Sequence, residues 1–439
     1  MIHTYWLETY GCQMNIAESN ALELQLKGAG LVPAATAEQA DCAIINTCTV
    51  RKSADNRTWG RLGYFAHIKG QRKLTLILTG CMAERMGDDL KEDAPQIDYV
   101  IGTNDKQRIV DILTSADGTF DQHSQAYTFG TSYYQEGEFS SYIPIMNGCN
   151  NFCSYCIVPY VRGREVSRPV SDILEEMAFL DSKGVREVTL LGQNVNSYSF
   201  EEQGEIITFP KLLQRLCSVQ NNIKWIRFES PHPKDFTQEL IQVIKEEPKI
   251  ARHLHIPMQS GSTRILGLMN RKYTREQFGA LIDALRNAIG DITFSTDVMV
   301  GFPSETETDY QDTLSMLDHM RCLEAFMYYF NPREGTKAVG MEAQVADEEK
   351  SRRLSSLIEF QHAIFAKEKQ KRSTDIVEVL VNQTSKHDAH SMLGKTEHNE
   401  MVVFPGSVPS GTLVFVQLTG LQGNTYTGRL LSSGAITHG

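Results

Sequence analysis

Residues 149–156 read CNNFCSYC and follow the apolar segment SYIPIMNG. Three thiolates on one short loop, spaced C-x3-C-x2-C, can hold three irons of a cubane iron–sulfur cluster and leave the fourth iron open to a ligand. An open position distinguishes catalytic metal sites from structural ones. Zinc commonly takes four ligands from two paired turns, and the chain has no second C-x2-C. A structural zinc site with a remote fourth ligand is therefore the less favoured alternative.

The cysteine loop follows the first of six apolar segments that alternate with stretches long enough to form helices. Six βα units predict a partial (β/α)6 barrel over residues 139–372, with its chemistry at the C-terminal ends of the strands. The six segments are SYIPIMNGC, REVTLLGQ, IKWIRFES, RHLHIPMQS, DITFSTDVMVG and LEAFMYYF.

Three further regions flank this barrel and complete an α/β chain. Residues 1–120 alternate strand-like segments with helical periodicity, which predicts an open parallel α/β domain. Residues 121–138 are polar and lack a sustained period, which is typical of a linker. Residues 373–439 carry short β-rich runs between Gly, Pro and Asn turns, which predicts a small all-β domain.

Three more cysteines, Cys12, Cys48 and Cys81, each follow a strand-like segment of the first domain. Turns that follow parallel strands meet at one edge of the sheet, where ligand sites gather and helix N-termini favour thiolates. On spacing alone, an assignment of these cysteines to the core stays open. The remaining three are predicted to be small core residues: Cys42, Cys217 and Cys322.

The composition is that of a folded globular protein, with 41% hydrophobic and 22% charged residues. Nine cysteines, an odd number, are more typical of metal ligands or catalytic thiols than of a disulfide framework. The N-terminus lacks the pattern of a signal peptide, and no apolar run reaches the length of a membrane span. We therefore expect a cytoplasmic protein with no membrane partner.

The spacing of the cysteine loop, together with the aromatic residue Tyr155 before its last cysteine, resembles the radical S-adenosylmethionine (SAM) superfamily. The words GCQMN, NTC and TGC around the three N-terminal cysteines resemble the radical SAM methylthiotransferases, and this resemblance covers essentially the whole chain, including a TRAM-like C-terminal domain. Within that family, four segments of the chain resemble the tRNA-modifying branch: GCQMN at 11–15, CSYCIVPYVRGREVSRP at 153–169, LLGQNVNSY at 190–198 and HIPMQSGSTRILGLMNRKYT at 255–274.

The resemblance implies an enzyme that adds a methylthio group to C2 of N6-isopentenyl-adenosine beside the tRNA anticodon. It implies that one SAM is the radical source and a second SAM is the methyl donor. It also implies a monomeric protein that takes electrons from a donor such as flavodoxin or ferredoxin. Two 4Fe–4S clusters are implied, the radical-generating one on Cys149, Cys153 and Cys156 and an auxiliary, sulfur-presenting one on Cys12, Cys48 and Cys81. The alternatives are methylthiolation of a ribosomal protein side chain and a non-catalytic iron–sulfur RNA-binding protein.

The resemblance also assigns SAM contacts to residues at the strand ends. The second strand end would bind the SAM amino group, the third the ribose hydroxyls, and the fifth the adenine; ordinary strand-end caps are the alternative. The SAM-binding candidates are Tyr155, Gly192, Gln193, Asn194, Glu229, Ser230, Val300 and Gly301.

Binding of RNA must be reconciled with a formal net charge of −11, because proteins that bind nucleic acid are commonly basic. The segment 51–73 is a local exception, with seven Lys or Arg residues, one Asp and interleaved aromatic residues. Such a segment favours contact with an anticodon stem and unpaired bases, and a solvated helix face is the alternative. The RNA-binding candidates are Arg51, Lys52, Arg57, Arg61, Arg162, Arg164, Arg168, Arg271 and Lys272.

Overall fold

The computed structural model describes residues 2–49, 52–115, 127–130, 134–219 and 222–432. The first domain is built on a five-stranded parallel sheet in the order β2-β1-β3-β4-β5. Its central strand, with the sequence CAIINT, is buried at every position, as a parallel strand with both faces covered requires. The strands are β1 (Thr4–Thr9), β2 (Val32–Pro33), β3 (Cys42–Thr47), β4 (Thr75–Gly80) and β5 (Tyr99–Ile101). The helices are α1 (Gln13–Gly28), α2 (Lys52–Gln71), α3 (Cys81–Met86), α4 (Asp89–Asp93) and α5 (Arg108–Thr114).

The predicted barrel strands all form, and they pair as two three-stranded parallel sheets. An isolated parallel bridge links Ile226 of β12 to Ile250, just before β13, so the two sheets follow one another as in the predicted partial (β/α)6 barrel. The strands are β6 (Ser140–Pro144), β9 (Glu187–Leu191), β12 (Trp225–Phe228), β13 (His253–His255), β14 (Thr293–Val300) and β15 (Glu324–Tyr329).

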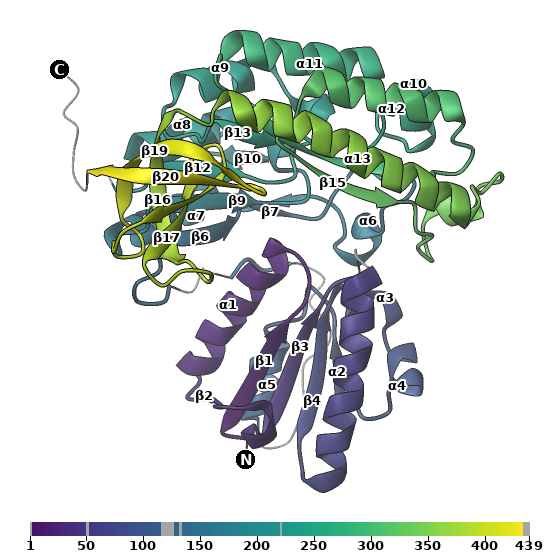
Figure 1. Cartoon of the computed structure of the whole chain (residues 1–439). Helices are drawn as coiled ribbons and strands as arrows, with labels where there is room; N and C mark the ends of the chain where they lie inside the picture. The colour runs from purple at the N-terminus through teal and green to yellow at the C-terminus, as the bar shows by residue number, and fades with distance from the viewer. Residues whose placement is uncertain (1, 50–51, 116–126, 131–133, 220–221, 433–439) are drawn as a thin grey trace.

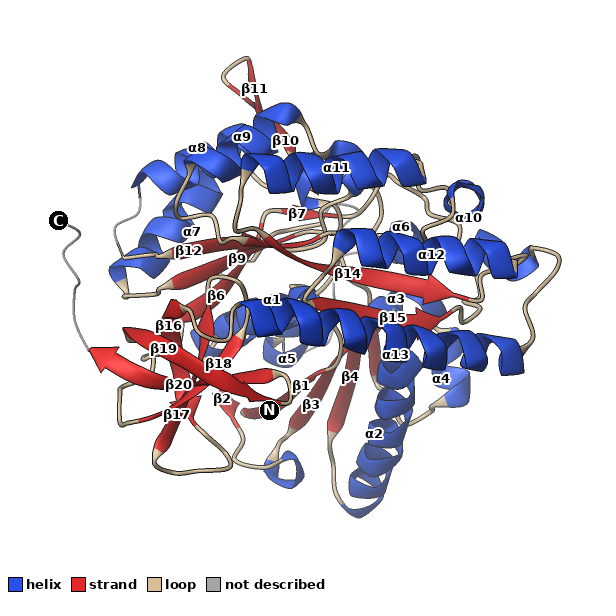
Figure 2. Ribbon diagram, turned by 45° about the horizontal axis from the view of Figure 1, so that its top comes forward, coloured by secondary structure: helices blue, strands red, loops and turns tan. Residues whose placement is uncertain are grey.

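Long helices cover the outer side of these strands, and Figure 2 shows them as a blue layer over the red sheet. They are α7 (Val170–Ser182), α8 (Phe209–Val219), α9 (Gln238–Glu246), α11 (Arg275–Ala288), α12 (Glu307–Met320) and α13 (Asp347–Lys371). Shorter elements lie in the loops: β7 (Met146–Asn147), α6 (Val158–Val161), β8 (Val166–Ser167), β10 (Ser199–Glu202), β11 (Glu205–Thr208) and α10 (Thr263–Leu268).

The C-terminal domain is a closed barrel in the order β16-β17-β18-β20-β19, which confirms the predicted small all-β fold. Alternate residues of β19 point inward to an apolar core, as the period of a strand requires. The strands are β16 (Ile376–Thr384), β17 (Ser391–Thr396), β18 (Met401–Pro405), β19 (Leu413–Gln422) and β20 (Thr425–Ser432).

The two outer domains contact opposite ends of the central strands (Figure 1). On the side of the C-terminal domain, Arg227 of β12 donates to the carbonyls of Thr396 and Glu397 at 2.8 and 2.7 Å, and Lys395 pairs at 2.6 Å with Glu187, the first residue of β9. The N-terminal domain packs through α1 against β6 and Leu191 at the end of β9, and through α3 against the short helix α6. Within the described residues, no helix combines the length and hydropathy that crossing a membrane requires.

Candidate active site

The N-terminal cysteines (Cys12, Cys48 and Cys81) lie at one edge of the parallel sheet, beyond the carboxyl ends of neighbouring strands. Thr9 pairs with Asn46, and Thr47 pairs with Gly80, so β1, β3 and β4 end level with one another. The turn after each strand therefore brings its cysteine to the same edge.

Two glycines let these turns approach one another closely. A Cβ on Gly11 would lie 2.5 Å from the Cβ of Cys48, and one on Gly80 would lie 2.4 Å from the carbonyl oxygen of Thr47. Both glycines have positive φ angles, 133° and 94°, which other residues rarely adopt. The cradle that holds the N-terminal cysteines together thus depends on the absence of a side chain at both positions.

The chemistry of this donor set fits an iron–sulfur cluster. Burial raises the pKa of the Cys81 thiol, and the nearby cations Arg162 and Lys106 oppose that rise. Coordination to a metal deprotonates a thiol outright. Soft thiolate ligands favour a small set of metal centres, and iron–sulfur clusters belong to that set.

The loop cysteines (Cys149, Cys153 and Cys156) are held between β7 and β8, which pair antiparallel around the loop. The Cys149 N–H donates to the carbonyl of Gly163 at 3.1 Å, and the Cys156 N–H donates to that of Cys153 at 3.0 Å. Burial raises the pKa of Cys149 to about 11 and that of Cys156 to about 12. Metal binding at this loop therefore has to release thiol protons.

A cavity of about 1060 Å³ borders both cysteine sites. Cys12 of the N-terminal domain and Cys156 of the barrel loop both line it. The barrel strands contribute Glu229, His255 and Asp297, while β15 contributes a largely apolar wall. A molecule in this space can therefore contact both cysteine sites at once.

Three of the SAM-binding candidates line this cavity: Tyr155, Glu229 and Ser230. Ser230 has a φ of 60°, a strained conformation for a non-glycine residue that is often found at functional sites. Gln193 Oε1 and Asn194 Oδ1 are buried and accept no hydrogen bond from the described residues. Such acceptors suit an ammonium group.

The other five SAM-binding candidates, Gln193 and Asn194 among them, lie off the described cavity wall. Gly192 packs against Met146, because a Cβ there would lie 2.5 Å from Met146 Cγ, and Val300 is buried. Gly301 is covered by the side chain of Lys350, whose Cγ would lie 2.4 Å from an added Cβ. Their SAM contacts stay predictions.

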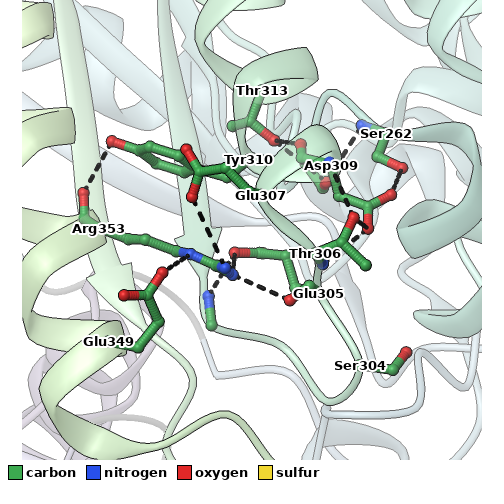
Figure 3. A network of polar contacts seen from close by, with 12 residues as sticks. Ser262, Ser304, Glu305, Thr306, Glu307, Asp309, Tyr310, Thr313, Glu349 and Arg353 are labelled. Atoms are coloured by element: carbon green, nitrogen blue, oxygen red, sulfur yellow. Dashed lines mark hydrogen bonds and ion pairs between the residues drawn. The ribbon is translucent and has the colours of Figure 1, made fainter.

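The loop after β14 is fixed by a polar network that reaches it from α13 (Figure 3). Glu305 accepts the N–H of Gly301 at 2.9 Å and Nη1 of Arg353 at 2.8 Å. Arg353 Nε also donates to Glu349 at 2.7 Å. These bonds hold the backbone at the fifth strand end in one conformation.

Sequence reasoning missed the polar residues on the inner face of the barrel, and Phe326 beside them. His255 Nε2 lies 3.0 Å from Asp297 Oδ2, and Ser295 Oγ bridges the rings of His253 and His255 at 3.0 Å each. The available signal was the segment HLHIP, where two histidines alternate with apolar residues on a barrel strand.

A pH dependence of stability follows from His255. Burial opposes its protonation, but the hydrogen bond and charge of Asp297, with Glu229 and Glu324 nearby, raise the net pKa. A raised pKa stabilises the fold below the unfolded pKa, and this contribution is lost as pH rises through the folded pKa. We expect the difference in thermal midpoint between wild type and His255→Gln, in the metal-free protein, to be largest below the unfolded pKa of about 6.5 and to shrink as the pH rises above it. An equal difference at all pH values would contradict the pairing.

The prediction of RNA contact is wrong for three arginines, because their guanidinium groups are buried and paired within the protein. Arg162 pairs with Glu18 and Arg168 with Glu176. Arg271 Nη1 donates to Cys153 Sγ at 3.5 Å, which makes it a neighbour of the cysteine loop. Hydrogen bonds to cluster sulfurs are among the factors that set a reduction potential.

The other RNA-binding candidates stay predictions. Arg57, Arg164 and Lys272 are exposed, and the Arg164 guanidinium lies 4.4 Å from the ring centre of Phe152. Arg61 is partly buried and paired with Glu8. The remaining two fall outside what the structure describes, Arg51 entirely and Lys52 in its side chain.

Two family models match the chain: "Uncharacterized protein family UPF0004" over residues 4–102 and "Radical SAM superfamily" over residues 143–317. The chain is 44% identical to the tRNA-2-methylthio-N(6)-dimethylallyladenosine synthase of Treponema pallidum strain Nichols, over 98% of this chain and all of that protein. It is 41% identical to the protein of the same name from Phocaeicola vulgatus, over 96% of this chain and 95% of that one.

Among solved structures, the radical SAM methyltransferase TsrM from Kitasatospora setae, with cobalamin and a 4Fe–4S cluster bound, is similar with a TM-score of 0.57. The match covers 77% of each chain at 14% sequence identity, and it supports the fold alone.

Proposed function

The chain belongs to the family of radical SAM tRNA-2-methylthio-N(6)-dimethylallyladenosine synthases, and on this premise we propose that it transfers a methylthio group to C2 of N6-isopentenyl-adenosine beside the tRNA anticodon. The single observation that carries this proposal is the cavity bordered by both Cys12 and Cys156. A substrate adenine placed there would face the radical source on one side and the sulfur-presenting site on the other.

The proposed ligand sets are the N-terminal cysteines for the auxiliary cluster and the loop cysteines for the radical cluster. The C2–H of a purine is not acidic, so its replacement needs the radical chemistry that the loop cluster with SAM supplies when bound. The protein's own residues bind SAM and orient it. Glu229 and Ser230 at the cavity wall would take SAM hydroxyls, and Gln193 and Asn194 its ammonium group.

The substrate must reach this cavity as part of a folded tRNA. Exposed cations near the cysteine loop, Arg164 and Lys272, and Arg57 on α2 are proposed to contact the phosphate backbone. We further propose a monomer that acts in the cytoplasm, where tRNA is modified, and draws electrons from a flavodoxin or ferredoxin.

The apolar wall on β15 is the proposed site for the isopentenyl group. Phe326 lines the cavity and leaves 44% of its surface exposed, which is unusual for a large apolar side chain. Burial of a prenyl group against it would stabilise the complex by about 1.5–3 kcal/mol. We expect Phe326→Ala to lower kcat/KM for isopentenylated tRNA by roughly 10- to 100-fold, as measured by nucleoside mass spectrometry.

The matched control is Phe179→Ala, because Phe179 on the outer helix α7 leaves 45% of its surface exposed and lies off the described cavity wall. It should leave kcat/KM nearly unchanged. Equal losses in both variants would argue against a prenyl site at Phe326.

The decisive test of the function incubates reduced, cluster-loaded protein and SAM with isopentenylated tRNA that lacks the methylthio group. Nucleosides are then separated and identified by mass spectrometry. We expect a 2-methylthio product on tRNA. Absence of this product, together with a methylthio group on a ribosomal protein offered in parallel, would select the rival substrate.

A further inference from the structure

A buried arginine connects the two cysteine sites. Arg162 caps the C-terminal end of α6, six residues after Cys156, and reaches across to α1 of the N-terminal domain. Its Nη1 donates to Glu18 Oε1 at 2.7 Å, and its Nη2 donates to Asn15 Oδ1 at 3.1 Å. Arg162 and Glu18 are 4% and 7% exposed, so this pair is shielded from water.

The partners of Arg162 are themselves tied to the cysteine turns. Asn15 Nδ2 donates to the carbonyls of Tyr10 at 3.0 Å and Thr47 at 2.9 Å, just before Cys12 and Cys48 in the chain. On the other side, Arg162 Nη1 donates at 2.9 Å to the side chain of Asn147, two residues before Cys149. One guanidinium group therefore contacts segments that carry cysteines of both sites.

A second cation shares the carboxylate of this junction. Lys106 also pairs with Glu18, and the hydroxyl of Tyr127 donates to Glu18 Oε1 at 3.1 Å. Burial alone would raise the pKa of Glu18, but Arg162 and Lys106 lower it to about 2. The carboxylate is charged at any working pH, and it keeps Lys106 as a partner when Arg162 is replaced, so Arg162→Met leaves no unpaired charge at Glu18.

We propose that Arg162 is a positioning residue that fixes the register between the N-terminal cysteines and the loop cysteines across the cavity. This inference rests on the proposed function, because a fixed register is what keeps SAM cleavage at one site coupled to methylthio transfer from the other. Displacements of about 1 Å can cost two orders of magnitude in rate when reacting groups must be aligned.

Arg168 offers a closely matched control. It is also buried, 3% exposed, and it pairs with a buried glutamate, Glu176, but both partners belong to the barrel. Arg162→Met should keep 5′-deoxyadenosine formation from SAM within about threefold of wild type while the methylthio product per deoxyadenosine falls by roughly 10-fold or more. Arg168→Met should leave that ratio at the wild-type value, and Arg162→Lys should restore part of it. An unchanged ratio in Arg162→Met, or the same fall in both methionine variants, would overturn the proposal.

A second readout needs neither clusters nor turnover. In calorimetry of the metal-free protein, Arg162→Met and Glu18→Gln should separate the unfolding of the N-terminal domain from that of the barrel, whereas Arg168→Met should lower the midpoint of the shared transition without separating the two domains. Identical unfolding profiles for Arg162→Met and Arg168→Met would overturn the positioning role. If wild type forms no methylthio product on tRNA, the proposed function fails, while calorimetry still decides the role of Arg162.

Discussion

Cys153→Ala is expected to abolish SAM cleavage, with 5′-deoxyadenosine formation falling on the order of 1000-fold or more. Cys153 is the middle of the loop cysteines, is 9% exposed, and its sulfur accepts a hydrogen bond from Arg271. Two thiolates are too few to hold the cluster that leaves one iron open. Iron per chain should fall from about eight to about four after anaerobic reconstitution.

The control for this variant is Cys217→Ala, which removes a thiol of similar burial from α8, within the barrel core. It should retain about eight irons and wild-type deoxyadenosine formation. Full deoxyadenosine formation by Cys153→Ala, or zinc in place of iron in the wild type, would contradict the assignment of the loop cysteines.

Cys48→Ala is expected to separate the two halves of the reaction. Cys48 directly follows β3, the central strand of the N-terminal sheet, and is 1% exposed. Its loss should leave about four irons per chain. Deoxyadenosine formation should continue, because the loop cysteines are intact, while the methylthio product on tRNA falls on the order of 100-fold or more. Nucleoside mass spectrometry measures the methylthio product, and the amount of 5′-deoxyadenosine is determined on the same samples.

The outcome that would contradict this assignment is continued product formation by Cys48→Ala at the wild-type ratio to deoxyadenosine. Cys42→Ala is the matched control, since Cys42 begins the same strand at its other end and is fully buried. It should retain both the irons and the product.

The fold was predictable because its long strands are marked by their local sequence. Each barrel strand lies in a run of apolar residues closed by a polar or glycine-bearing turn, and these runs form β6, β9, β12, β13, β14 and β15. The two-residue strands were not predictable. Met146 of β7 pairs with Ser167 of β8, and nothing in either short segment marks a partner 21 residues away.

The site was predictable where it depends on strand ends and not where it depends on distant partners. Cysteines that follow parallel strands must reach one edge, so the position of Cys48 beside Gly11 could be expected. The burial of Arg162 could not, because its partner Glu18 is 144 residues away in the chain. A basic residue in a sequence looks the same whether it faces a phosphate or a buried carboxylate.

Two clusters are expected to face each other across one cavity, and electron paramagnetic resonance of the reduced protein tests this arrangement most directly. Clusters that share a cavity of about 1060 Å³ lie close enough for their spins to interact. The wild-type spectrum should therefore be broadened or split relative to the sum of the spectra of Cys153→Ala and Cys48→Ala, each of which retains one cluster. A wild-type spectrum equal to that sum would contradict the account.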